Sequence, residues 1–191
     1  MAGDAKQVKS VHELELLAAP VALQPGGYMA VAYAGADAAP ITKSLELEVA
    51  RPPGSWRIRL RWSCPEPVRD VSGDPALFPD AAALLSPQHE ASPWITMGAP
   101  GMGVDGVLWR ADSERLRRMS AEGLGSMKRD EAPERWRFEA KHDRGFWQLE
   151  LTLPGWATLD GSGRLGAAVW RGSAQQRGGL KSVTPGFVVV V

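Results

Sequence analysis

The fold is decided by Trp56-Arg57-Ile58-Arg59-Leu60-Arg61-Trp62, in which large apolar residues alternate with arginines. Successive side chains of a β-strand point to opposite faces, so this segment predicts a strand with one buried and one solvated face. Residues 45–49 and 146–153 alternate in the same way. Residues 136–140 precede the second of these across the turn 142–145, which predicts an antiparallel hairpin.

Glycine and proline punctuate the rest of the chain, with 21 Gly and 15 Pro in 191 residues. This spacing predicts many short strands joined by turns. We expect an all-β fold, an antiparallel β-sandwich with long loops and one or two short helices. A single domain covers residues 1–191, and its polar residues 1–12 are expected to be loose. Further strands are expected at 28–33, 103–110, 165–171 and 187–191, and helical turns at 74–85 and 112–127.

The composition excludes several classes of protein. The 22 Lys and Arg balance the 22 Asp and Glu, so no basic excess points to nucleic acid. No run of 18 apolar residues predicts a membrane span, and residues 1–6 lack the pattern of a signal peptide. Cys64 is the only cysteine, which excludes an internal disulfide, a Cys₄ zinc site, an iron–sulfur cluster held by this chain alone and a covalently attached haem.

The sequence carries no recognisable catalytic constellation. His12, His89 and His142 show neither zinc-ligand spacing nor a nearby nucleophile motif. The glycine-rich segments 98–103 and 161–166 lack the Lys-Ser/Thr ending of a phosphate-binding loop, so we expect turns there.

Two other short loops each carry one potential metal ligand. Met97 lies in Ile95-Thr96-Met97-Gly98, and Lys181 lies in Arg177-Gly178-Gly179-Leu180-Lys181-Ser182-Val183. Taken singly, a loop methionine is most often a packing residue and a lysine is most often at the surface. If the fold brings the two together, they could hold a haem iron between a thioether and an amine.

An ordered set of motifs makes this pairing more specific. In order and spacing the set resembles the haem b-binding gamma subunits of the ethylbenzene dehydrogenase type. These subunits accompany molybdenum enzymes of the dimethyl sulfoxide reductase family, including dimethyl sulfide dehydrogenase, chlorate reductase and selenate reductase. The resemblance runs from Trp56 to the C-terminus, and its motifs are residues 78–87, 94–98, 104–112, 121–126, 168–173 and 177–183.

The resemblance implies a β-sandwich that holds one non-covalent haem b with Met97 and Lys181 as the axial iron ligands. Met102 is an alternative thioether, although it lacks the preceding Trp-Ile-Thr. The family's Trp-Asp-Gly reads Trp170-Arg171-Gly172 in this chain. A thioether favours reduced iron, and a lysine ligand has to bind as the neutral amine.

The resemblance further implies a non-catalytic, periplasmic electron-transfer subunit. Its partners would be a molybdenum-cofactor catalytic alpha subunit, an iron–sulfur beta subunit and an external carrier such as a soluble cytochrome c. The alternative is a haem-free β-sandwich ligand- or carbohydrate-binding module, in which several exposed residues among the eight Trp would stack on a sugar ring. The joint presence of Met97-Gly98 and Lys181-Ser182 favours the haem subunit, because a sugar-binding module has no use for the pair.

Overall fold

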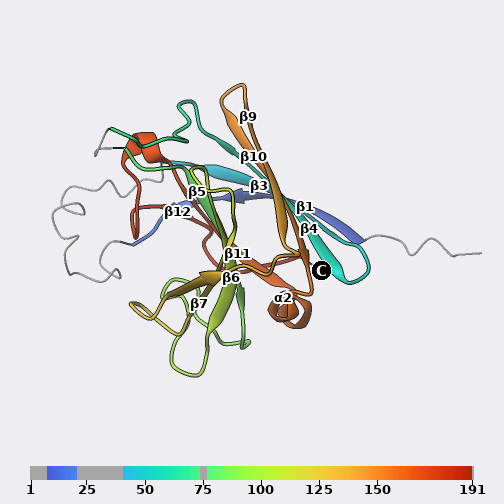
Figure 1. Cartoon of the computed structure of the whole chain (residues 1–191). Coiled ribbons are helices and arrows are strands. Elements are labelled where there is room, and N and C mark those ends of the chain that lie inside the picture. Colours follow the sequence, from blue (N-terminus) through green and yellow to red (C-terminus); the bar gives the residue numbers. More distant parts are fainter. Residues whose placement is uncertain (1–7, 21–40, 74–76, 191) are drawn as a thin grey trace, which may run out of the picture.

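A computed structural model describes residues 8–20, 41–73 and 77–190, and within them the strands form two antiparallel sheets (Figure 1). The first sheet has five strands in the order β1-β3-β4-β10-β9. The hairpin predicted at 136–153 is confirmed as β9 and β10, and the strand predicted at 56–62 is β4. The bounds are β1 Val8–Glu15, β3 Ser44–Arg51, β4 Ser55–Ser63, β9 Arg137–Asp143 and β10 Phe146–Pro154.

The second sheet follows the order β2-β12-β11-β5-β6-β7-β8, and β13 pairs with β11 beside this path. The short helix α2 (Ala157–Ser162) and the 3₁₀ turn η2 (Gly172–Ala174) flank β11. The predicted antiparallel β-sandwich is therefore confirmed. The bounds are β2 Leu17–Ala18, β5 Ala81–Pro87, β6 Val104–Arg110, β7 Arg117–Ala121, β8 Lys128–Glu131, β11 Arg164–Trp170, β12 Ser182–Val183 and β13 Val188–Val189.

A tryptophan-rich core fills the space between the sheets. The apolar sides of β3, β4 and β10 pack against alternate residues of β5, β6 and β11. Trp62, Trp109 and Trp147 meet at the centre, with ring centroids 4.9 to 6.4 Å apart. Six of the eight Trp residues are buried and the other two are half-buried, so the expectation of several exposed Trp is wrong. Large rings with offset contacts suit the interior of a sandwich.

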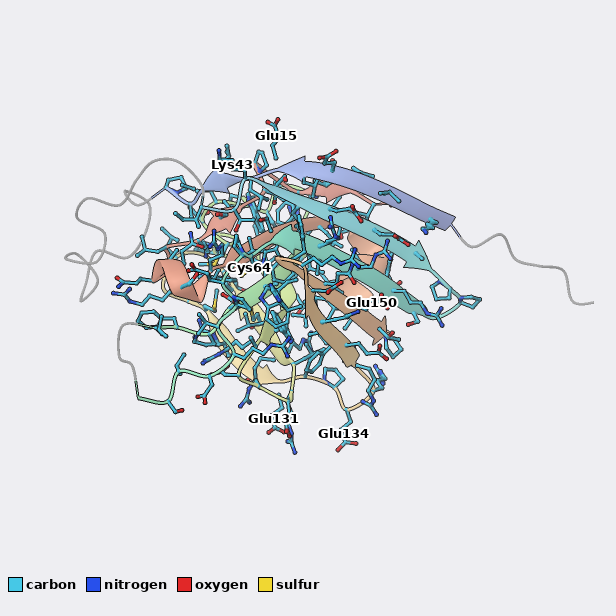
Figure 2. All side chains as sticks on the ribbon, turned by 90° about the horizontal axis from the view of Figure 1, so that it is seen from above. Glu15, Lys43, Cys64, Glu131, Glu134 and Glu150 are labelled. Atoms are coloured by element: carbon cyan, nitrogen blue, oxygen red, sulfur yellow. The ribbon has the colours of Figure 1, made fainter. Side chains whose placement is uncertain are left out.

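The other side of the five-stranded sheet is a charged, solvated surface. Glu48 forms ion pairs with Lys9 and Arg59 there. Figure 2 shows Glu15 of this sheet pointing outward at the periphery, as do Glu131 and Glu134 elsewhere on the molecule, whereas Cys64 lies in the interior. This face has the mixed charge of an ordinary solvent-exposed sheet, so it offers no apolar docking site.

Asp80 joins four parts of the fold. Its carboxylate is fully buried and accepts hydrogen bonds from the backbone N–H groups of Gly172 at 2.7 Å and Val68 at 2.8 Å. Trp147 Nε1 donates at 2.8 Å and Cys64 Sγ at 3.4 Å. Position 172 has no room for a side chain, because a Cβ there would lie 1.5 Å from the carbonyl oxygen of Phe78.

Asp105 has a similar role at the opposite end of the sandwich. It is 1% exposed and accepts two hydrogen bonds from Arg118, at 3.0 and 3.2 Å. Trp156 Nε1 and Thr158 Oγ1 also donate to it, at 3.2 and 2.9 Å, which ties α2 to the eight-stranded sheet. Both Asp80 and Asp105 are buried, Asp105 within β6 and Asp80 immediately before β5.

The environment of Cys64 leads to a testable expectation. Burial, with the negative charge of Asp80 as the next cause, raises the pKa of this thiol from 9.0 to about 12. A raised thiol pKa stabilises the fold below pH 9, and this contribution is lost as the pH rises from about 9 to about 12. Since the thiolate is the reactive form, we expect no reaction with a disulfide reagent at pH 8 in the native protein and full reaction in denaturant. Rapid labelling of the native protein would contradict this environment.

Two helical predictions are wrong. The Ala-rich segment 74–85 contains strand β5, and its residues 74–76 lie outside the described ranges. The segment 112–127 contains strand β7, which is followed by Gly123 and Gly125 with positive φ. Tertiary burial overrides the helical propensity of alanine in β5, because both of its faces are covered.

The remaining expectations have mixed outcomes. Residues 8–12 belong to edge strand β1, although the sequence suggested a loose N-terminus, and the strand predicted at 28–33 falls outside the described residues. The strand predicted at 187–191 is reduced to β13, and α2 was not anticipated. Among the residues that the structure describes, no helix has the length and apolar character needed to cross a membrane.

Candidate functional site

The eight-stranded sheet has an apolar outer face, on the side away from the tryptophan core. Alternation along β5 sends Ala82 and Leu84 into the core and the residues between and beside them to this outer face. Because its lining is apolar, the outer face needs cover from water. It consists of Ala81, Ala83 and Leu85 from β5, Val104 and Leu108 from β6, Met119 and Ala121 from β7, and Ala168 and Val183 at the β11–β12 side.

Half-buried aromatic and methionine side chains cover the outer face. Trp94 lies against β11, where a Cβ on Gly166 would come within 2.4 Å of its ring. Its Nε1 donates to the carbonyl oxygen of Thr184 at 2.6 Å, and its ring meets Phe187 edge-on at 5.2 Å. The glycine thus lets a flat indole approach the sheet closely. The covering side chains are Trp94, Met97, Met127, Trp170 and Phe187.

Met97 is held at this face by a tight turn. Its N–H donates to the carbonyl oxygen of Trp94 at 2.9 Å, and the following N–H of Gly98 donates to that of Pro93 at 2.8 Å. Met97 itself has φ of 55°, in the left-handed region that methionine seldom occupies. Such backbone strain costs on the order of 1–3 kcal/mol and is concentrated at functional sites. The side chain packs against the outer-face cluster.

The alternative ligand Met102 has a different setting. It closes a small loop with Ala99, through two backbone hydrogen bonds of 3.0 and 2.8 Å. Its side chain is half-buried but is not part of the packing against the outer face described for Met97. The packing therefore favours Met97 as the thioether available to a ligand on this face.

Lys181 reaches the same region from the segment before β12. Its carbonyl oxygen accepts a hydrogen bond from Ala19 N–H at 3.0 Å, and its Nζ lies 5.2 Å from the ring centroid of Trp170. The residue keeps partial solvent exposure, yet desolvation lowers the pKa of its ammonium group from 10.5 to about 8, and the charge of Arg129 adds to the effect. At neutral pH roughly a tenth of the amine is then neutral, far more than for an ordinary lysine.

The strand register relates the two candidate ligands. Antiparallel pairing places Lys181 level with the Ala81 end of β5. Gly123, whose N–H donates to the carbonyl oxygen of Met97 at 3.1 Å, follows β7 at the Pro87 end of β5. These ends are six residues apart, or about 20 Å. Met97 and Lys181 therefore lie toward opposite ends of the strands that form the outer face.

The lowered pKa of Lys181 predicts a pH effect in the cofactor-free protein. The unfolded chain binds more protons between pH 8 and 10.5, so this residue makes the free energy of unfolding rise with pH over that window. The rise is at most about 3 kcal/mol. Urea unfolding of the parent and of Lys181→Met at pH 7.5 and 10 measures it, because subtraction removes the opposite effect of Cys64. An equal pH dependence in both proteins would contradict the desolvated amine.

The outer face fits a haem chemically. It offers small residues, aromatic cover, one soft sulfur and one desolvated amine, and among the described residues no cluster of three His, Cys, Asp or Glu offers a rival metal site. Apolar surroundings and a mixed sulfur–nitrogen donor pair suit haem iron. Met97 and Lys181 would be the residues that hold it.

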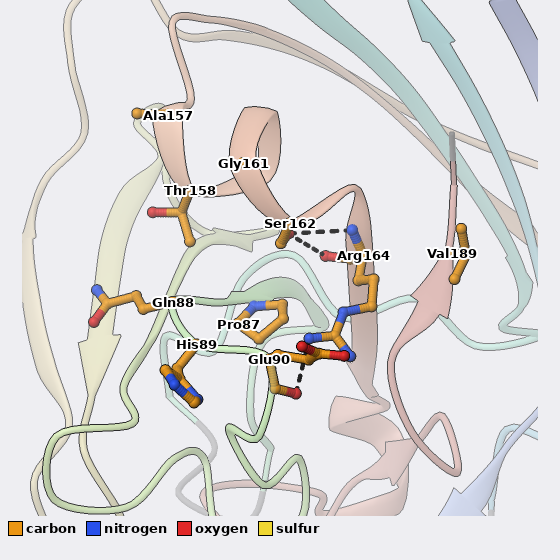
Figure 3. A pocket seen from close by; sticks show the side chains of 10 residues that line it. All are labelled: Pro87, Gln88, His89, Glu90, Ala157, Thr158, Gly161, Ser162, Arg164 and Val189. Atoms are coloured by element: carbon orange, nitrogen blue, oxygen red, sulfur yellow. Dashed lines mark hydrogen bonds between the residues drawn. The ribbon is translucent and has the colours of Figure 1, made fainter.

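A separate open cleft lies at the α2 end of the molecule (Figure 3). Its volume is about 860 Å³, and its lining includes His89, Glu90, Thr158 and Arg164. Arg164 donates to the carbonyl oxygen of Glu90 at 2.9 Å. Neither Met97 nor Lys181 lines this cleft, and none of its lining residues is Trp, Tyr or Phe, so it lacks the stacking platform that the carbohydrate-binding alternative requires.

The histidines have local structural roles. His142 Nε2 lies 2.8 Å from the carbonyl oxygen of Cys64, and its ring meets Trp147 edge-on at 5.4 Å. His12 lies 3.0 Å from Ser10 Oγ on β1, and His89 Nδ1 accepts a hydrogen bond from the N–H of Ala91. The three histidines lie on different segments of the chain, and each makes its contacts locally.

Comparison with known proteins gives one sequence relative. No protein-family model matches the chain. Over 155 residues the chain is 31% identical to a protein of Haloferax mediterranei named putative respiratory nitrate reductase heme subunit ORF7. The match covers 74% of this chain and 54% of that protein, so the chain spans about half the length of this curated relative.

Among solved structures, the chain is similar to a family 9 carbohydrate-binding module from Caldicellulosiruptor kristjanssonii in complex with glucose. The TM-score is 0.42 at 9% identity, covering 77% of this chain and 68% of that chain.

Proposed function

We propose that this protein is a haem-binding, non-catalytic electron-transfer subunit of a molybdenum oxidoreductase complex. The proposal is supported by two contacts: Met97 packs against the apolar outer face, and the desolvated amine of Lys181 lies 5.2 Å from the ring centroid of Trp170, which covers the same face. The name of the Haloferax relative, a heme subunit of a respiratory nitrate reductase, supports the same class of function.

The cofactor we propose is haem b. The only cysteine is buried and has a strongly raised pKa, so it is unsuited to covalent attachment. When bound, the haem supplies one-electron redox chemistry. Met97 would provide a thioether that favours reduced iron, and Lys181 would provide a neutral amine whose proton is already weakly held. If Met97 and Lys181 both hold the iron, the chemistry that the haem would supply is electron transfer alone.

The residues around the ligands would then hold the ring and exclude water. Trp94 and Phe187 pack over the β11 side, and the strands beneath the cover carry the small residues Ala81, Ala83 and Ala168. Excluding water strengthens electrostatic interactions at the iron and protects the reduced state. We further propose a periplasmic complex with a molybdenum-cofactor alpha subunit and an iron–sulfur beta subunit, exchanging electrons with a soluble cytochrome c.

The test is reconstitution of the full chain with haemin, followed by gel filtration and visible spectra in both oxidation states. We expect one retained haem per chain and a low-spin, six-coordinate spectrum that sharpens on reduction. Loss of all haem during filtration, or a high-spin five-coordinate spectrum, would overturn the proposal.

The proposed partners need a separate test in the native host. A tagged chain is purified under mild conditions, and the eluate is assayed for molybdenum and non-haem iron, with a Lys181→Ala chain as control for haem-independent assembly. Stoichiometric molybdenum supports the complex, whereas its absence from a haem-loaded chain contradicts it.

A further inference from the structure

One edge of strand β1 pairs with no other strand in the described part of the chain. β1 ends the five-stranded sheet, with β3 on one side of it only. Figure 2 shows β1, drawn in blue, along the margin of the molecule. The strand keeps its register with β3 over eight consecutive residues, and it contains no proline. A long and regular open edge of this kind is a template for another strand.

The direction of the free backbone groups on β1 follows from one hydrogen bond. The N–H of Leu16 donates to the carbonyl oxygen of Lys43 at 2.9 Å, which extends the β1–β3 register by one residue. Backbone groups alternate in direction along an antiparallel strand, so the even-numbered residues of β1 bond to β3. The N–H and C=O groups of Lys9, Val11 and Glu13 therefore point to the open edge.

The side chains of the same three residues lie on the solvated face of the sheet. Val11 is 61% exposed, and Lys9 and Glu13, two positions away on either side, are exposed as well. Glu13 takes part in none of the ion pairs of the described residues, and it lies directly opposite Glu46 of β3. Like charges directly opposite each other are unfavourable. A cation beside Glu13 would relieve this repulsion.

We propose that the open edge of β1 is the contact between two copies of this chain, paired antiparallel about a two-fold axis at Val11. This register places Val11 opposite Val11 of the copy, and it places Lys9 opposite Glu13 on both sides of the axis. Odd-numbered residues then face odd-numbered residues, so each of these facing pairs exchanges two backbone hydrogen bonds. The five-stranded sheet continues across the axis into the sheet of the copy.

The charge pattern selects a second copy as the occupant of this edge. Lysine and glutamate on an edge strand normally discourage pairing with other chains. In the two-fold register, however, each Glu13 receives a Lys9 from the copy, and the exposed Val11 gains an apolar contact. Such self-complementarity is what a two-fold contact between identical chains requires. The contact needs no cofactor, so this inference goes beyond the proposed function and does not depend on it.

Sedimentation velocity of the full chain without haem, at about 1 to 300 µM, tests the contact. We expect a reversible monomer–dimer equilibrium with a dissociation constant on the order of 10–100 µM, since an edge-to-edge contact is small. Val11→Lys places two like charges at the axis and should raise the dissociation constant by about 10-fold or more. Val189→Lys is the matched control, because Val189 lies on β13 and is equally exposed at 61%.

An exchange of charge between two variants tests the register. Lys9→Glu and Glu13→Lys each place like charges opposite each other, so each variant alone should dimerise more weakly than the parent. An equimolar mixture restores unlike pairs on both sides of the axis, and the mixed dimer should be about 10-fold tighter than either variant alone. Mixing does not repair a structural defect of one chain, so this gain reports on the contact itself.

Several results would overturn the β1 contact. They are a parent that stays monomeric at every concentration, a Val11→Lys dimer as tight as the parent, and a mixture no tighter than its two components. Equal weakening by Val189→Lys would indicate a general effect of the added charge and would overturn it as well. Urea unfolding followed by tryptophan fluorescence establishes that each variant is folded. Failure of the proposed function would appear as loss of haem, which none of these measurements uses.

Discussion

Replacing Asp80 by alanine is expected to lower the free energy of unfolding by about 3–5 kcal/mol, enough to unfold many single domains. The carboxylate is fully buried, and its removal leaves the N–H groups of Val68, Gly172 and Trp147 without their acceptor. Each unsatisfied buried donor costs about 1–3 kcal/mol, and the alanine also leaves a cavity.

Urea unfolding followed by tryptophan fluorescence measures this effect. Asp80→Asn keeps the volume and one acceptor oxygen, so it should be less destabilising than alanine. Asp70→Ala is the control, because Asp70 is exposed and binds only its neighbour Ser72, and its change should stay within about 0.5 kcal/mol. If Asp80→Ala were as stable as Asp70→Ala, the hydrogen bonds that Asp80 accepts would not be important for stability.

The second large effect is expected from the proposed iron ligands. Lys181→Ala should convert a six-coordinate haem into a five-coordinate one and weaken its retention, because alanine cannot supply the proposed nitrogen ligand. Met97→Ala should also vacate one axial position and lower the reduction potential, since the thioether favours reduced iron. Visible spectra, a redox titration and haem retention on gel filtration measure these changes.

Met102→Ala is the matched control for the thioether. It removes the same group from the same loop but from a residue outside the outer-face packing, so the spectrum and the potential should equal those of the parent. If Met102→Ala changed the iron and Met97→Ala did not, the ligand assignment would move to Met102. If neither substitution changed the iron, the thioether would be removed from the proposal.

The strands of the sandwich were predictable where one face of the strand is exposed to solvent. In β4 and β10 the alternation is complete, because charged residues face solvent and tryptophan or leucine faces the core. In β5 the alternation vanishes, since all seven of its residues are buried, and the Ala-rich run then looks like a helix. A strand covered on both sides has no periodic signal to distinguish it from a buried helix.

The segment 112–127 failed for a related reason. Leu116, Met119 and Leu124 have helical spacing, but Met119 and Ala121 are also two residues apart and share the outer face of β7. Gly123 and Gly125, with φ of 115° and 80°, then end the strand in turns that no helix could contain. The glycines were the better guide, because positive φ is a backbone requirement.

The two candidate ligands could be identified from their loop sequences, but the residues that surround them in the fold could not. Met97-Gly98 and Lys181-Ser182 are separated by more than 80 residues in the sequence, and only the fold relates their positions to the outer face. The role of Asp80 depends on hydrogen bonds to residues that are distant in the sequence, which single-sequence patterns do not carry.

Strand β5 is buried on both sides, so it separates two apolar clusters: the tryptophan core on one side and the covered outer face on the other. The tryptophan core can keep the chain folded when no cofactor is bound at the outer face, so a cofactor could be gained or exchanged without unfolding the two sheets. The size of the β5 side chains is therefore constrained, because a bulkier residue at any β5 position would clash with one apolar cluster or the other. Tolerated substitutions in β5 should therefore be limited to small apolar residues, whereas the loops above the strand can accept more varied residues.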